Sequence, residues 1–101
     1  MKFPTFSLSN ELSALKKFEN LKQNERNIVF YSENENSMFI FKPLIDELVV
    51  KYNLNICYVT SSKNESILTT SNDKIKSFCI GDGIVRTKFF MNLKADILIM
   101  T

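Results

Sequence analysis

The stretch Ile28-Val29-Phe30-Tyr31-Ser32 decides the fold, because it is a short, continuous apolar run of strand-forming residues. A polar loop over 33–37 follows, and apolar residues spaced three or four apart from Phe41 to Tyr52 then predict a helix. Pro43 is expected in or near the first turn of that helix, where a missing N–H is tolerated. The run Ile56-Cys57-Tyr58-Val59-Thr60 predicts a second strand, so the first two strands should be parallel.

The alternation of strand and helix continues to the end of the sequence. Residues 61–72 leave room for one short helical turn, and 75–80 predict a third strand. A spacing of four between apolar residues from Ile84 predicts a helix that ends near Lys94, and 96–101 predict a fourth strand. We expect the strand order 3-2-1-4, with 28–32 and 96–100 adjacent near the centre of the sheet.

An amphipathic helix is also predicted before the first strand, from the apolar positions Leu8, Leu12, Leu15, Phe18 and Leu21. The fold class is therefore α/β. We expect a Rossmann-like, three-layer unit with a four-stranded parallel sheet, preceded by this amphipathic helix. We divide the chain into an N-terminal helical arm over 1–26 and a Rossmann-like domain over 27–101.

The arm has two interpretations. A contact with a membrane surface is one, because Phe3, Phe6 and Leu8 adjoin four basic residues, Lys16, Lys17, Lys22 and Arg26. Packing of the apolar face on the sheet, or on a second domain, is the commoner use of such a helix, and we favour it.

Composition limits the classes of function. The 101 residues, 45% of them hydrophobic, suffice for one small core, and a net charge of +2 is too small to favour nucleic acid. The sequence holds no histidine, which is the commonest general base and the commonest transition-metal ligand. We therefore expect neither a metal site nor a cofactor in this chain.

The two cysteines, Cys57 and Cys79, each lie within an apolar run. Both are expected to be reduced and buried in neighbouring strands, which favours the cytoplasm. No apolar stretch approaches the roughly 20 residues that cross a bilayer. The inner membrane face remains an alternative location only through a surface contact of the arm.

Candidate binding residues follow three of the predicted strands, because ligands bind at the carboxyl ends of strands in open parallel sheets. The loops concerned are 32–37, 60–63 and 81–87. Within Gly81-Asp82-Gly83-Ile84-Val85-Arg86-Thr87 a turn opens a helix, where backbone N–H groups and the helix dipole favour a phosphate or carboxylate. Arg86 would add a bidentate contact to that anion.

From the residues alone we favour a structural interpretation of the same segment. Gly81 and Gly83 would then only permit a tight turn, while Arg86 pairs with Asp82 or Glu33 at the surface. The Ser32–Glu33 pair is either a substrate-facing pair or an ordinary strand end, and we favour the strand end. A general acid and base formed by Glu33 and Asp82 would require that the fold bring them together.

Several blocks of the sequence resemble the N-terminal region of proteins similar to CDP-glycerol glycerophosphotransferases. The strongest is Gly-x-Gly-x-x-Arg-Thr-x-Phe-Phe from Gly81 to Phe90, followed by Ala95-Asp96 and an apolar strand that ends in Met100-Thr101. The other blocks are Phe18–Leu21, Glu25-Arg26, Ile28–Glu33, Lys42–Leu48 and Tyr58–Ser61. The resemblance covers roughly residues 18 to 101.

This resemblance implies a two-domain transferase of the GT-B type, whose N-terminal Rossmann-like domain faces a C-terminal nucleotide-binding domain across a cleft. The N-terminal half of such enzymes chiefly serves the acceptor. Members of the wider group transfer glycerol phosphate from CDP-glycerol onto a membrane-linked glycan. The sequence departs from the family at Asn34–Phe39, where a glycine and aromatic residues are expected.

Two hypotheses remain open. In the first, the chain is the acceptor-side part of such a transferase, inactive alone, with a nucleotide-binding domain continuing past Thr101. Its phosphate or acceptor-binding residues would be Ser32, Glu33, Gly81, Asp82, Gly83, Arg86 and Thr87, and its acceptor a phosphorylated or lipid-linked glycan. In the second, the chain is a small binding or interaction module, completed by a partner chain along the fourth strand.

Overall fold

A computed structural model describes residues 5–69 and 72–100 of the chain. Helices α1 and α2 precede the first and second strands, and helix α3 precedes the fourth. The helices are α1 (Thr5–Glu19), α2 (Met38–Asp46) and α3 (Ile84–Met91), and the strands are β1 (Ile28–Ser32), β2 (Ile56–Thr60), β3 (Ile75–Cys79) and β4 (Ile97–Met100). Shorter helical turns are η1 (Gln23–Glu25), η2 (Glu35–Ser37), η3 (Glu47–Lys51) and η4 (Ser66–Thr69).

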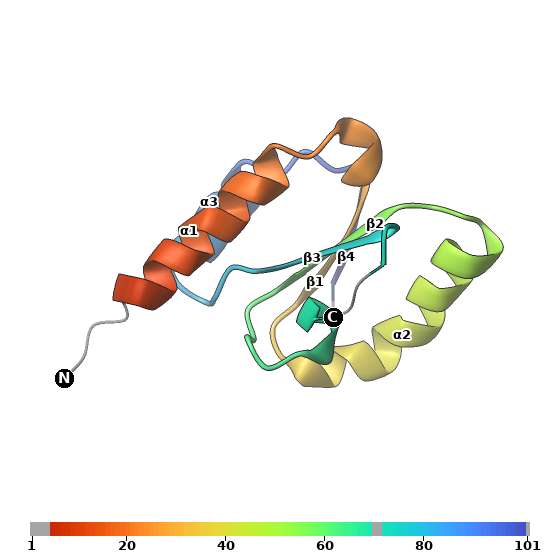
Figure 1. Cartoon of the computed structure of the whole chain (residues 1–101), viewed down its shortest axis with the longest axis horizontal. Helices are drawn as coiled ribbons and strands as arrows, with labels where there is room; N and C mark the ends of the chain where they lie inside the picture. The colour runs from red at the N-terminus through yellow and green to blue at the C-terminus, as the bar shows by residue number, and fades with distance from the viewer. Residues whose placement is uncertain (1–4, 70–71, 101) are drawn as a thin grey trace.

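The four strands form one parallel sheet in the order β3-β2-β1-β4, which confirms the expected topology (Figure 1). Phe30 of β1 is in register with Tyr58 of β2 and with Ile99 of β4, so β1 and β4 are adjacent as predicted. The expected central position of β4 is wrong for the described residues, because β4 lies at an edge of this sheet. Its apolar sequence had suggested burial on both sides.

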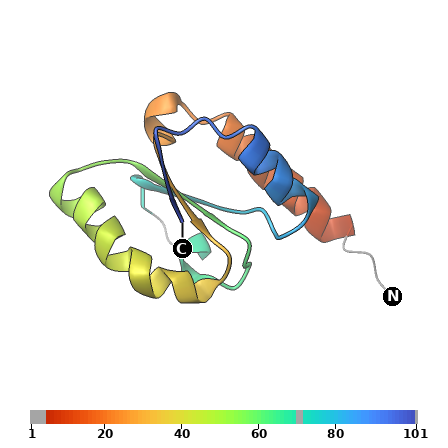
Figure 2. The ribbon, with the colours of Figure 1, turned by 180° about the vertical axis from the view of Figure 1, so that it is seen from behind.

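Helices α1 and α3 lie side by side on one face of the sheet (Figures 1 and 2). Leu15 and Phe18 of α1 and Phe89 of α3 pack there against Tyr31 of β1 and Val59 of β2. The apolar face of the arm therefore covers the sheet, as the favoured interpretation predicted. Leu8 and Leu12, by contrast, are 39% and 41% exposed.

Helix α2 covers the opposite face and completes a Rossmann-like, three-layer arrangement (Figure 2). Phe41 and Ile45 of α2 pack on Phe30 of β1 and on Ile56 and Tyr58 of β2. Alternate residues of β1 and β2 thus belong to two different cores, because successive side chains of a strand point to opposite faces. This explains why both strands are apolar without interruption.

The second helix begins earlier than predicted, at Met38 rather than near Phe41. The Asn34 side chain accepts a hydrogen bond from the Asn36 N–H at 2.9 Å, which starts the turn η2 and leads directly into α2. Pro43 therefore lies inside α2. The Phe39 carbonyl loses its helical donor there, and water can reach this turn because Phe39 is 91% exposed.

Other boundaries deviate by a few residues. Helix α3 ends at Met91 instead of near Lys94, because Asn92 leaves the helical conformation with φ −111° and ψ 12°. The single short turn expected between 61 and 72 is present as η4. Phe3, the side chain of Phe6, and Thr101 lie outside the described part of the structure. Of the three apolar residues in the proposed membrane contact, only Leu8 is therefore described. Over 5–69 and 72–100, no helix is long and apolar enough to cross a bilayer.

Both cysteines are free thiols, and the predicted burial is confirmed for Cys57 but not for Cys79. Cys57 is completely buried in β2, and its Sγ donates to the Glu25 carbonyl at 3.1 Å. Cys79 ends the neighbouring strand β3 and is only half-buried. An edge strand is covered less completely than an interior one, which accounts for the exposure of Cys79.

Candidate functional site

The three predicted loops converge at the carboxyl edge of the sheet. The segment after β1 begins with Glu33, the segment after β2 with Ser61, and the segment after β3 with Ile80 and Gly81. Two hydrogen bonds join them: the Ser61 N–H donates to the Ser32 carbonyl, and the Ile80 N–H donates to the Thr60 carbonyl, both at 2.9 Å. Strand order reverses between β1 and β4, which makes this edge the topological switch point where α/β folds bind ligands.

Ser32 and Glu33 do not act as a pair, because they point in different directions. Ser32 is completely buried on the α2 side, and its Oγ donates to the Asn34 carbonyl at 2.5 Å. Glu33 is exposed and lies 4.0 Å from Arg86, measured from Oε1 to Nη1. Glu33 therefore belongs to the outer rim of the edge, whereas Ser32 shapes the backbone of the loop.

Arg86 projects from the first turn of α3 toward the end of β1. Its Nη1 donates a long hydrogen bond of 3.5 Å to the Tyr31 hydroxyl. The Tyr31 hydroxyl, with the carboxylates of Glu33 and Asp82, raises the pKa of Arg86 above its ordinary value. The side chain of Arg86 is 35% exposed, so its guanidinium is anchored and still accessible.

Sequence reasoning missed two hydroxyl groups beside Arg86. The Tyr31 hydroxyl lies 2.5 Å from Ser61 Oγ, so the ends of β1 and β2 share a hydrogen bond next to the guanidinium. Tyr31 had been assigned to a strand core, and it is only 2% exposed. The signal that would have found it is alternation along β1, which directs Tyr31 and Ser32 to opposite faces.

The glycine turn before α3 is shaped by a contact with α1. Gly81 has φ +69°, in the left-handed region that favours glycine, and a Cβ there would lie 2.2 Å from Glu11 Oε2. Burial and the nearby Asp82 raise the pKa of Glu11. The carboxylates of Glu11 and Asp82 would repel an anion at this turn, so the turn itself is a weaker phosphate site than Arg86.

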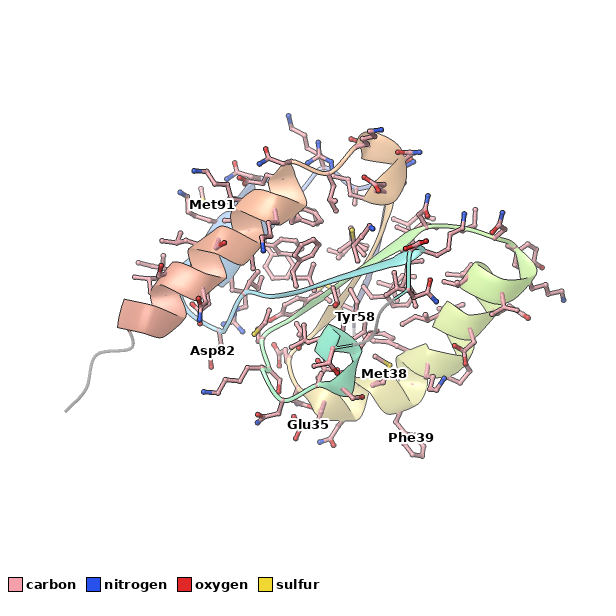
Figure 3. The ribbon with its side chains drawn as sticks, viewed as in Figure 1. Glu35, Met38, Phe39, Tyr58, Asp82 and Met91 are labelled. Carbon is pink, nitrogen blue, oxygen red and sulfur yellow. The ribbon has the colours of Figure 1, made fainter. Side chains whose placement is uncertain are left out.

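The rest of the predicted segment behaves as an ordinary helix start. Gly83 is the N-cap residue and has no atom within 4 Å of a built Cβ. Thr87 is exposed on the first turn, and its N–H donates to the Gly83 carbonyl at 3.3 Å. Asp82 is exposed at the turn, as Figure 3 shows. No interaction joins Asp82 to Glu33 directly within the described chain, so a paired acid and base between them has no geometric support.

A second polar group is buried on the α2 side of the sheet, beside η4 (Figure 3). The Tyr58 hydroxyl donates to Glu65 Oε1 at 2.7 Å, and Glu65 is only 5% exposed. Its Oε2 is buried and has no hydrogen-bond partner in the described part of the chain. Burial raises the pKa of Tyr58, and the Glu65 carboxylate adds to the rise, whereas Ser32 opposes it. The sheet separates this group from Arg86.

A shallow surface hollow of about 900 Å³ runs along the outer side of α2, away from Arg86. Its lining includes Phe39, Ile40 and Pro43, and Figure 3 shows Phe39 projecting away from the molecule. Its lining also includes Glu35, Asn36, Lys42 and Asp46, of which Lys42 and Asp46 pair with each other at 2.9 Å. The hollow resembles a contact surface more than an active site.

No protein family model, curated protein or solved structure matches the chain.

Proposed function

We propose that the chain is the acceptor-side part of a transferase similar to CDP-glycerol glycerophosphotransferases, and that it binds its acceptor at the carboxyl edge of the sheet. The single observation that carries this proposal is the position of Arg86. The resemblance places an arginine after the glycine turn, and the fold brings that arginine to the switch point between β1 and β4.

Arg86 suits a phosphate-bearing acceptor, such as a phosphorylated or lipid-linked glycan, because its guanidinium offers a fork of N–H donors. Gly81, Asp82, Gly83 and Thr87 would then form the rim of the site rather than its main contact. Glu33, 4.0 Å from Arg86, supplies the opposite charge that the phosphate must displace. One wall of this kind positions only the acceptor.

Transfer requires that both reactants be held together, which supplies roughly 7–11 kcal/mol of the barrier reduction in well-oriented reactions. We therefore expect the 101 residues alone to release no CMP from CDP-glycerol, with a phosphoprenyl-linked acceptor, above the uncatalysed rate. The same assay with the product of the whole reading frame should show release, and Arg86→Ala should reduce it. CMP release by the 101 residues alone, lost in Arg86→Ala, would contradict the proposed division of labour.

A second candidate is a binding or interaction module, and the outer edge of β4 favours it. Among the described residues no strand pairs with that edge, and Ile97 and Met100 are each 51% exposed. Unpaired apolar edges are templates for another strand. Analytical ultracentrifugation of the chain and of Met100→Lys tests this candidate: self-association that the charged residue abolishes supports it, and a monomer at all concentrations argues against pairing between copies.

A further inference from the structure

The hydroxyl groups beside Arg86 form a connected chain of donors and acceptors. Arg86 Nη1 lies 3.5 Å from the Tyr31 hydroxyl, which lies 2.5 Å from Ser61 Oγ. The three side chains come from α3, β1 and the segment after β2, which only the fold brings together. Arginine donates and never accepts, so it must be the donor to Tyr31.

Burial decides the direction of the remaining hydrogen bond. Were Ser61 to donate to Tyr31, the phenolic proton would be left in a side chain that is 2% exposed, with no acceptor among the described residues. An unsatisfied buried donor is costly. Tyr31 therefore donates to Ser61, and the proton of the half-buried Ser61 hydroxyl is left to point outward.

The aromatic core holds Tyr31 in this arrangement. Its ring stacks on Phe89, with centroids 6.3 Å apart, and meets Phe90 edge-on at 4.9 Å. Both phenylalanines belong to α3, the helix that carries Arg86. The position of the Tyr31 hydroxyl relative to the guanidinium is thus fixed by packing before any ligand arrives.

We propose that Tyr31 is a positioning residue for this site: it holds Arg86 and orients Ser61 so that both donate to one phosphate group, in competition with Glu33. This inference rests on the proposed function for the identity of the site and adds the residues that build it. Tyr31 accepts a hydrogen bond from the Arg86 cation and donates one to Ser61. The Ser61 hydroxyl thereby becomes a better donor, because successive hydrogen bonds polarise one another. Glu33, 67% exposed and 4.0 Å away, is the group that phosphate replaces.

The test is titration of the 101-residue chain with inorganic phosphate, followed by NMR of the backbone amides around 61 and 86 and of the Arg86 Nε–H. Phosphate should bind at millimolar concentration, and Arg86→Ala should weaken binding more than tenfold. Tyr31→Phe should weaken it about threefold to tenfold, the usual effect of one hydrogen bond. Glu33→Gln should strengthen it. Tyr52→Phe removes the same hydroxyl from an exposed tyrosine after η3 and should change nothing.

A positioning role makes a further demand, that Tyr31 act through Arg86 and Ser61. The effect of Tyr31→Phe on phosphate binding should therefore be smaller in the Arg86→Ala background, where only the hydrogen bond to Ser61 remains, a non-additivity that a merely structural role would not produce. Thermal unfolding of each variant shows whether it is folded, and Ser61→Ala tests the same donor without touching the aromatic core. Phosphate binding that needs Arg86 but neither hydroxyl would overturn the inference and leave the proposed function standing. Absence of phosphate-dependent shifts in both the wild-type chain and Glu33→Gln would overturn the inference together with the phosphate contact.

Discussion

Removal of the Tyr58 hydroxyl should destabilise the fold strongly, because that hydroxyl is the only group that satisfies a buried carboxylate in the described chain. Glu65 is 5% exposed, its Oε1 accepts from Tyr58 at 2.7 Å, and its Oε2 has no partner. Tyr58→Phe leaves both oxygens of Glu65 without a hydrogen bond while the ring still fills its place in the core. Hydrogen bonds to charged groups contribute roughly 1.5–3 kcal/mol.

We therefore expect Tyr58→Phe to lower the free energy of unfolding by about 1.5–3 kcal/mol. For a domain of this size the midpoint of thermal unfolding should fall by roughly 6–24 °C. Urea denaturation followed by circular dichroism measures the change, and an unchanged m value shows that the unfolded state is the same. Tyr31→Phe is the matched control: its hydroxyl bonds a neutral serine and makes only a long contact of 3.5 Å with the accessible Arg86, so the loss should be about 0.5–1.5 kcal/mol.

The charge of Glu65 provides the decisive comparison. In the Glu65→Gln background the group left without a partner is neutral, so Tyr58→Phe should cost clearly less than in the wild-type chain. An equal cost in both backgrounds would show that the destabilisation comes from the ring rather than from the buried carboxylate. A Tyr58→Phe variant within about 0.5 kcal/mol of wild type would refute the reasoning altogether.

Three further predictions concern the cysteines and the glycine turn. Burial, followed by the nearby Glu25, raises the pKa of Cys57 from 9.0 to about 12. The protonated thiol therefore contributes fully to the free energy of unfolding below pH 9, and this contribution is lost at about 1.4 kcal/mol per pH unit between pH 9 and 12. Cys57→Ala should flatten the pH dependence of the free energy of unfolding in that range. A bulky maleimide should label the half-buried Cys79 before Cys57 in the native chain, and equal rates would contradict the burial seen here. Gly81→Ala should lower the free energy of unfolding by about 1–2 kcal/mol, because of the positive φ at Gly81 and the clash of the added Cβ with Glu11. Gly83→Ala should cost less, because nothing lies within 4 Å of a Cβ there. Adding Glu11→Ala to Gly81→Ala should restore only the stability lost through the clash.

The order of the strands could be predicted from the sequence because each element has its own pattern. Continuous apolar runs at 28–32 and 56–60 indicate strands covered on both faces, and the intervening helices force parallel neighbours. The ends of the helices were harder to predict. The side chain of Asn34 caps the turn that leads into the second helix, so this helix begins before Pro43 and contains it. The predicted order already ends with β4, so the expectation that β4 lies near the centre came only from its apolar sequence, which looks the same at an edge and at a centre.

The candidate site was only partly predictable for a related reason. Arg86 and Glu33 stand out as charged residues beside strand ends, and the fold brings them within 4.0 Å. Ser32 was expected beside them, but it points to the other face. Glu65 lies in a polar stretch that predicts only a loop, and nothing in the order of residues shows that its carboxylate is buried.

Tyr31 shows why such a site escapes a reading of single residues. Its ring belongs to the core, where it packs on Phe89 and Phe90 and stabilises the fold. Its hydroxyl lies at the end of β1, between Ser61 and Arg86, where we propose that it positions both for binding. Tyr31→Phe separates the two, because it retains the packing and removes the hydroxyl. A loss of phosphate binding that exceeds any loss of stability would therefore assign the hydroxyl to the site, whereas a change in stability alone would assign the whole residue to the core.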